Sequence, residues 1–232
     1  MKILGLIPAR GGSKGIPNKN RKVLNGKPLL QYTIEAALGS KLLNKVVFSS
    51  EDETLIKLAK SLGAEVPFVR PSNLSNDNSG TLEVVQHAIK KLKVNGNDFD
   101  AVCLLQVTNP FRTSELIDKA IKKFEISGTD TLLSVLKVPH EYNPHWTFKV
   151  SESGYLKLAT GENRIIKRRQ DLPDAYHRDG AIYLVKTDIV LNQNTLYGKT
   201  ISYIESNSKL HINIDTAKDW EKAVEMAKKL HL

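Results

Sequence analysis

The chain of 232 residues contains a single cysteine, Cys103, and this scarcity excludes several kinds of protein. A lone thiol supports neither an internal disulfide framework nor a zinc site built from paired cysteines. Because Cys103 lies within an apolar run, we interpret it as a small buried hydrophobic residue. No run reaches the roughly 18 apolar residues that a membrane-spanning helix needs. The chain opens on a predicted strand instead of a signal peptide, so we expect a cytoplasmic protein with no membrane partner.

Further absences bear on function. The sequence has neither the GxxxxGK[ST] pattern of P-loops nor the GxGxxG fingerprint of dinucleotide-binding folds, and its histidines are not spaced as metal ligands. The net charge of +9 indicates an anionic partner, which could be a nucleotide, a nucleic acid or an acidic sugar. Aromatic residues make up 6% of the chain and form no stacking platform. A non-enzymatic nucleic-acid-binding protein is therefore an alternative to which we give little weight, and we expect no nucleic-acid partner.

Apolar runs alternate with segments of helical period, which predicts an α/β fold with an open, mostly parallel, Rossmann-like sheet covered on both faces. The expected strands cover residues 2–9, 45–50, 65–70, 100–106, 131–138, 181–186 and 201–206. The expected helices cover residues 28–40, 50–63, 81–92, 113–128 and 216–232. Ser50 and Glu53 have the spacing of a capping box for the second helix. Regularity fails between residues 139 and 180, which we interpret as an excursion from the sheet within a single domain of residues 1–232.

The stretch IPARGGSKGIPNKN, residues 7–20, places glycines and basic residues directly after the first strand. Open α/β sheets bind ligands beyond the carboxyl ends of their strands. Glycines let backbone N–H groups approach an anion, while arginine and lysine add donors that match phosphate oxygens. The segment therefore predicts a polyphosphate site, with a mobile surface turn as the alternative.

This stretch resembles the signature of the CMP-sialic acid synthetase (acylneuraminate cytidylyltransferase) family, and it differs from the first loop of the related CMP-Kdo synthetases. The resemblance recurs in LLQVTNPFRT, RRQDLP, GAIYL and IDTAKDW and so spans nearly the whole chain. It implies a fold of the nucleotide-diphospho-sugar transferase type, and a cytidylyltransferase that joins CTP to a 2-keto sugar acid and releases pyrophosphate. It also implies a homodimer in which the 139–180 excursion makes the contact. A nucleotidyltransferase acting on another sugar or a sugar phosphate is the alternative, although the RRQDLP block argues against it.

The resemblance implies nucleotide contacts for the first loop and for the start of the third predicted helix. The implied residues are Arg10, Gly11, Gly12, Ser13, Lys14, Lys19, Asn20, Asp77 and Thr81. Arg10 and Lys19 would act on the phosphates during the reaction, and Asn20 would lie near the base or ribose. Asp77 and Ser79 could equally cap the helix.

Sugar contacts are implied for Gln106, Arg112, Arg169, Gln170, Tyr176 and Asp179. Arg112 could bind the sugar carboxylate or pair with a carboxylate inside the fold. The basic cluster at Arg169 could instead be a solvated hairpin or a dimer contact. Val107 and Asn109 replace a proline and a serine that are usual in the family. Asp179 stands where the family carries asparagine, which argues for a different sugar substituent.

The resemblance also implies a pair of aspartates that hold Mg²⁺ (or Mn²⁺), and here the chain reads Asn213-Ile214-Asp215. Mg²⁺ favours carboxylate and phosphate oxygens together with water. Asp215 can supply an anionic ligand and a catalytic role, whereas Asn213 can supply a neutral carbonyl oxygen. Asp215 or Thr216 could also cap the last helix.

Overall fold

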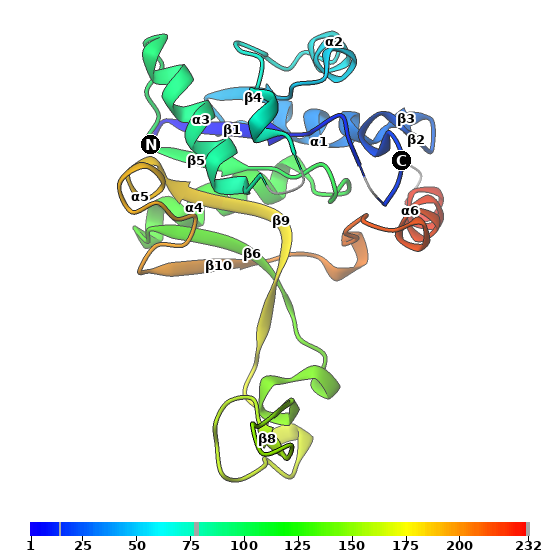
Figure 1. Ribbon diagram of the computed structural model, residues 1–232, viewed down its shortest axis with the longest axis vertical. Coiled ribbons are helices and arrows are strands. Elements are labelled where there is room, and N and C mark those ends of the chain that lie inside the picture. Colours follow the sequence, from blue (N-terminus) through cyan, green and yellow to red (C-terminus); the bar gives the residue numbers. More distant parts are fainter. Residues whose placement is uncertain (14, 77–78, 231–232) are drawn as a thin grey trace.

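The computed structural model describes residues 1–13, 15–76 and 79–230. Its centre is a six-stranded sheet with the order β10-β6-β9-β5-β1-β4. These strands are β1 (Ile3–Pro8), β4 (Lys45–Ser49), β5 (Ala101–Leu104), β6 (Thr131–Lys137), β9 (Tyr176–Lys186) and β10 (Ile201–Glu205). The pairs β1–β4, β1–β5 and β6–β10 are parallel, whereas β9 runs antiparallel to both β5 and β6. The predicted open, mostly parallel sheet is confirmed (Figure 1).

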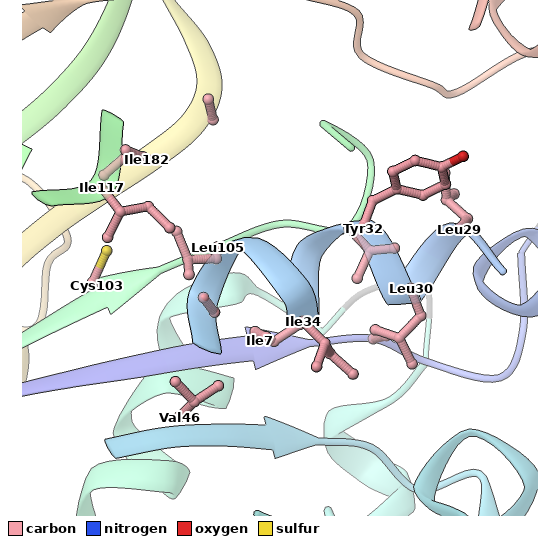
Figure 2. Packing of buried hydrophobic residues seen from close by; sticks show 14 of the residues in the cluster. Ile7, Leu29, Leu30, Tyr32, Ile34, Val46, Cys103, Leu105, Ile117 and Ile182 are labelled. Atoms are coloured by element: carbon pink, nitrogen blue, oxygen red, sulfur yellow. The ribbon is translucent and has the colours of Figure 1, made fainter. Parts of the chain in front are cut away.

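Helices cover both faces of this sheet and divide the core into two layers. The helices are α1 (Leu29–Leu38), α2 (Glu53–Ser61), α3 (Thr81–Val94), α4 (Ser114–Ser127), α5 (Thr187–Asn192) and α6 (Ala217–Lys229). Side chains of α1, α2, α4 and α6 pack in one apolar cluster, and those of α3 and α5 in the other. In Figure 2, Leu30 and Ile34 of α1 point toward Ile7 of β1 and Val46 of β4. Cys103 is fully buried in the same layer, as its apolar surroundings predicted.

Two local predictions are wrong. Residues 65–70 do not form a strand, because pairing with β4 stops after one bridge between Val47 and Glu65. Pro67 lacks the N–H that a continued ladder would need. Helix α2 begins at Glu53, and its N-cap is Asp52, whose carboxylate accepts the Leu55 N–H at 2.8 Å. The expected Ser50–Glu53 capping box is therefore absent.

Of the two predicted caps of helix α6, Asp215 and Thr216, the structure has Thr216 as the N-cap. Thr216 accepts the backbone N–H of Asp219, and Asp219 accepts the N–H of Thr216 in return. This reciprocal capping box leaves the Asp215 side chain available for another role.

The remaining short elements lie outside the main sheet. They are the hairpins β2 (Val23–Leu24) with β3 (Lys27–Pro28) and β7 (Phe148–Val150) with β8 (Leu156–Leu158), and the 3₁₀ turns η1 (Lys19–Arg21), η2 (Ser72–Leu74), η3 (His140–Tyr142), η4 (Pro144–Trp146), η5 (Arg169–Asp171) and η6 (Ser208–Leu210). The chain between β6 and β9 carries β7 and β8 and projects well away from the sheet, as the lower lobe of Figure 1. None of the helices formed by the described residues combines the length and apolarity that crossing a bilayer requires.

Candidate active site

A polar pocket of about 470 Å³ lies beyond the carboxyl ends of β1 and β5. It gathers most of the described residues that were predicted to contact the nucleotide, together with Gln106 and the predicted metal ligands. These residues are Arg10, Gly12, Ser13, Lys19, Asn20, Thr81, Gln106, Asn213 and Asp215. Lys14 and Asp77 lie outside the described residues. Parallel strands bring their carboxyl ends to one edge, which is why segments so distant in sequence meet here.

The first loop is held in a compact shape against the chain that precedes α6. Asn20 donates its side-chain amide to the backbone carbonyl of Arg10 at 2.9 Å, so the loop closes on itself. A Cβ atom on Gly15 would stand 2.1 Å from the carbonyl oxygen of Asp215, and glycine is therefore required at this contact. A Cβ on Gly12 would meet no atom within 4 Å, so the backbone there faces open space. The loop thus presents backbone and side-chain donors toward the pocket.

Glu51 and Arg70 anchor this loop from behind, and the sequence pattern did not indicate either residue. Arg70 is buried, lines the pocket, and donates at 2.8 Å to both the carbonyl of Ala9 and the carboxylate of Glu51. The other carboxylate oxygen of Glu51 accepts the N–H of Gly11 at 2.8 Å. Burial acts to raise the pKa of Glu51, but the hydrogen bonds from Arg70 and Gly11 outweigh it and leave that pKa below its ordinary value. The amide of Gly11, which was predicted to bind the nucleotide, is therefore occupied by Glu51.

Lys19 lies in the first loop but is buried, since the residue is 9% exposed. Its ammonium donates to the carbonyl of Ile214 at 2.6 Å and contacts Asp215 Oδ1 at 3.2 Å. The side chain nevertheless borders the pocket. Lys19 thus joins the first loop to the segment that carries the predicted metal ligands.

The donor set at Asn213 and Asp215 fits a divalent cation that takes its other ligands from phosphates and water. The Asp215 side chain is 60% exposed and borders the pocket, and Asn213 donates its amide N–H to Asp215 Oδ2 at 2.5 Å. The Asn213 side-chain carbonyl remains as an acceptor. Among the described residues, no group of three or more His, Cys, Asp or Glu side chains could hold a metal alone. Mg²⁺ sites of one or two protein ligands plus substrate phosphates are common in nucleotide-dependent enzymes.

Helix α3 begins at the rim of the pocket. Its N-cap is Gly80, which makes no side-chain capping bond, and Thr81 is its first residue. Ser79, which was one of the two predicted caps, instead donates to the carbonyl of Asn73 at 3.0 Å. Thr81 therefore opens a helix whose N-cap residue offers no side-chain acceptor, and the backbone N–H groups of a helix N-terminus favour an electronegative ligand.

A second cavity of about 420 Å³ adjoins the first and shares Gly80, Thr81 and Gln106 with it. Arg178 of β9 lines this cavity and donates to the hydroxyl of Tyr197 at 2.9 Å and to that of Tyr183 at 3.4 Å. None of these three residues was predicted as a site residue, although Tyr183 lies within the GAIYL block and Arg178 stands next to Asp179. They place a cation and two hydroxyl groups next to the nucleotide pocket.

Several predicted sugar contacts lie elsewhere in this chain. Arg112 and Asp179 are each 5% exposed and line a different cavity of about 350 Å³, together with side chains of α4 and β10. Arg169 and Gln170 belong to η5 in the projecting excursion and border neither pocket. Tyr176 opens β9 and stacks on Tyr203 at a ring-centroid distance of 5.0 Å. Of the predicted sugar contacts, Gln106 is the one that the described structure brings to the pocket.

Comparison with known proteins assigns this architecture to a family. The profile of the cytidylyltransferase family matches residues 4–232. The chain belongs to this family. The match includes the first loop, the Gln106 segment and the Asn213–Asp215 segment, so the pocket is built entirely from family positions.

The relatives of this cytidylyltransferase are named for pseudaminic, legionaminic and acylneuraminic acids. It is 37% identical to pseudaminic acid cytidylyltransferase from Campylobacter jejuni, over 95% of this chain and 94% of the relative. It is 32% identical to CMP-N,N'-diacetyllegionaminic acid synthase from Legionella pneumophila, over 97% of both chains. It is also 32% identical to N-acylneuraminate cytidylyltransferase from Escherichia coli, over 98% of this chain and 52% of that longer protein.

Solved structures agree on the fold. A CMP:2-keto-3-deoxy-manno-octonic acid synthetase solved in complex with CTP superposes with a TM-score of 0.74 at 16% identity, covering 99% of this chain and 100% of that one. A 4-diphosphocytidyl-2C-methyl-D-erythritol synthase from Anaerococcus prevotii gives a TM-score of 0.68 at 12% identity, covering 98% and 96%.

Proposed function

We propose that this protein transfers the cytidylyl group of CTP to a nonulosonic acid of the sialic, legionaminic or pseudaminic type, giving a CMP-sugar and pyrophosphate. The observation that carries the proposal is the pair of adjoining cavities, one lined by phosphate-type donors and the other by Gln106 and Arg178. Family membership and the names of the relatives support the choice of nucleotide and sugar.

In this proposal the triphosphate lies along the first loop. Arg10, Ser13 and Lys19 border the pocket there and offer charged and hydroxyl donors to its oxygens. Transfer at phosphorus depends mainly on positioning and on stabilising charge that grows on the leaving group. A donor already fixed in place contributes about 3–4 kcal/mol to such a step. Lys19, held by the Ile214 carbonyl, is fixed in this way.

A divalent cation, Mg²⁺ or Mn²⁺, would be held by Asp215 with Asn213 beside it. When bound it would offset the negative charge of the phosphates. The two side chains border the pocket beside Lys19, so the cation would be held at that wall.

The sugar acid is assigned to the adjoining cavity. Arg178 offers its guanidinium to the sugar carboxylate, and the hydroxyl groups of Tyr183 and Tyr197 hold that guanidinium in place. Gln106 lies at the junction of both cavities and is suited to a sugar hydroxyl. A hydroxyl oxygen of the sugar then bonds to the α-phosphorus as the bond to the bridging oxygen of pyrophosphate breaks, and the hydroxyl proton is lost.

Pyrophosphate release provides the test. The purified protein is offered CTP, UTP, ATP or GTP with a panel of nonulosonic acids, an eight-carbon keto acid and a sugar 1-phosphate. We expect release with CTP and at least one nonulosonic acid. Release with the sugar phosphate alone, or no release with any nonulosonic acid, would contradict the proposal.

We further propose a homodimer formed through the excursion between β6 and β9. Val150, Tyr155 and Leu156 are exposed on this projecting segment, which a partner chain would cover. Arg169 and Gln170 could then reach the pocket of the partner subunit. Sedimentation velocity of the whole chain and of a Tyr155→Asp variant tests this: a monomer in both samples would refute it. The proposal also places the enzyme in the cytoplasm, where cell fractionation should recover it.

A further inference from the structure

Arg112 works inside the fold as a clamp on the loop between β5 and α4. Its Nη2 donates to the backbone carbonyl of Gln106 and to that of Asn109, the latter at 2.6 Å. These carbonyls lie at the two ends of the turn that carries Val107 and Thr108 along the nucleotide pocket. Arg112 does not line the nucleotide pocket, so its guanidinium fixes the turn from the opposite side.

Asp179 works in the same way on a bulge in β9. The pairing of β9 with β6 shifts register between Leu133 and Val135, and Gly180 has a φ of 81°. Asp179 Oδ1 accepts the hydroxyl of Ser134 and the N–H of Ala181 at 2.9 Å. The bulge thus has a backbone donor satisfied by a side chain instead of by the neighbouring strand.

Ser134 completes this arrangement. Its hydroxyl oxygen accepts the N–H of Ile182 at 2.7 Å while its proton is donated to Asp179. Ser134 is 1% exposed, so water cannot replace these bonds.

The clamped turn and the bulge meet at Gln106. The side-chain oxygen of Gln106 lies 3.6 Å from the place where a Cβ on Gly180 would stand. Asn109 donates its side-chain amide to the backbone carbonyl of Asp179 at 3.2 Å, which ties the turn to the bulge directly. A shift of either element would therefore move Gln106 relative to Arg178, which directly precedes Asp179 in β9.

Arg112 and Asp179 are also electrically complementary. Both line the cavity of about 350 Å³, and Nε and Nη1 of Arg112 and Oδ2 of Asp179 are buried without hydrogen-bond partners among the described residues. Burial lowers the pKa of Arg112 to about 10, and the charge of Asp179 opposes that change. A buried cation without a counter-charge is costly, so Asp179 stabilises the charged clamp.

We propose that the opposite buried charges of Asp179 and Arg112, which share a cavity without an ion-pair contact, together position Gln106 for the sugar acid without touching either substrate. The proposal rests on the proposed function, because it assigns Gln106 to the sugar. It replaces a direct contact between Asp179 and the sugar with an indirect role. The Asp179→Asn substitution separates the effect of the Asp179 charge from that of its hydrogen bonds. Asparagine retains an oxygen that can accept from Ser134 and Ala181, but it carries no charge.

The test compares Asp179→Asn with Glu205→Gln, which neutralises another carboxylate lining the same cavity. We expect Asp179→Asn to raise the KM for the sugar acid about tenfold while the KM for CTP changes less than about twofold. The loss should be the same for every sugar acid that the wild type accepts. Glu205→Gln should leave both constants as in the wild type. An unchanged sugar KM, an equal rise in the KM for CTP, or a new order of preference among sugar acids would overturn the proposal.

Hydrogen exchange provides a readout that does not depend on turnover. In Asp179→Asn, a peptide covering residues 105–112 should exchange about tenfold faster than in the wild type, because the clamp is weakened. Unchanged exchange there would overturn the proposal even if the wild type showed no activity on sugar acids, whereas that lack of activity would refute only the proposed function.

A double variant covers the case in which Asp179→Asn does not fold. Arg112→Gln with Asp179→Asn removes both charges and should restore folding, since no buried charge is left unpaired. Its residues 105–112 should still exchange faster than in the wild type. Slow exchange of this segment in the double variant would show that the charge pair does not hold it.

Discussion

Removing the Glu51 carboxylate should both destabilise the fold and weaken CTP binding, because this group anchors the first loop. Glu51 accepts the N–H of Gly11 and the guanidinium of Arg70, each at 2.8 Å. The Arg70 side chain is 5% exposed and that of Glu51 is 23% exposed. Deleting one partner of a buried ion pair costs about 3–5 kcal/mol. Since Glu51 is partly solvated, we expect Glu51→Ala to cost about 3 kcal/mol, at the lower end of that range.

Urea denaturation measures this loss directly. With a slope of about 3 kcal/mol per molar urea, the midpoint should fall by about 1 M. The freed loop should also raise the KM for CTP about tenfold, which corresponds to about 1.4 kcal/mol of binding. Glu51→Gln, which keeps an acceptor oxygen but loses the charge, should give a smaller loss in both measurements.

Glu65→Ala is the matched control. Glu65 pairs with Lys45 at 2.9 Å, but its side chain is 55% exposed, so the pair should contribute less than about 1 kcal/mol. If Glu51→Ala behaved like this control in stability and in the KM for CTP, the anchoring role of the Glu51 carboxylate would be refuted.

Further outcomes are expected near the same loop. Lys19→Ala should lower kcat/KM for CTP by about 100-fold or more. It should also cost about 2 kcal/mol of stability, because the hydrogen bond to the Ile214 carbonyl is lost. Wild-type kinetics in this variant would exclude Lys19 from the site. Asp215→Asn should raise the Mg²⁺ concentration needed for half-maximal activity about tenfold, and an unchanged metal titration would exclude Asp215 as a ligand. The pKa of Glu51 is lowered in the folded state, so its contribution to stability is present above the unfolded pKa of about 4.3 and is lost as pH falls through the folded value. The free energy of unfolding should therefore drop less between pH 5 and pH 3 in Glu51→Gln than in the wild type, and identical pH profiles would contradict this.

The layered α/β architecture followed from hydrophobic periodicity, but strand direction did not. β9 is a long strand whose apolar half, residues 181–186, was predicted as a strand. Its antiparallel direction depends on where the excursion returns the chain to the sheet, and the local sequence does not determine that position. The strand predicted for residues 65–70 was wrong for a local reason, because Pro67 interrupts the hydrogen-bond ladder with β4.

The structure brings together those predicted site residues that directly follow a strand. Arg10, Ser13 and Gln106 lie just beyond β1 and β5, whose adjacent carboxyl ends bring them to one pocket. Arg70 and Arg178 were missed: Arg70 matches no motif, and Arg178 precedes Asp179 and the GAIYL block without being part of that block. Their place in the cavities depends on how the segments pack.

The sequence by itself determined that this is an α/β protein with a loop of glycines and basic residues at the tip of its first strand, because periodicity and the local chemistry of these residues act over a few positions. Tertiary structure decided which of the charged residues face the pocket. Asp179 and Arg112 look like ligand-binding residues in the chain, yet packing buries both behind Gln106. The reason is that exposure and counter-charges are set by contacts between segments far apart in sequence, such as Glu51 with Gly11 and Lys19 with Ile214.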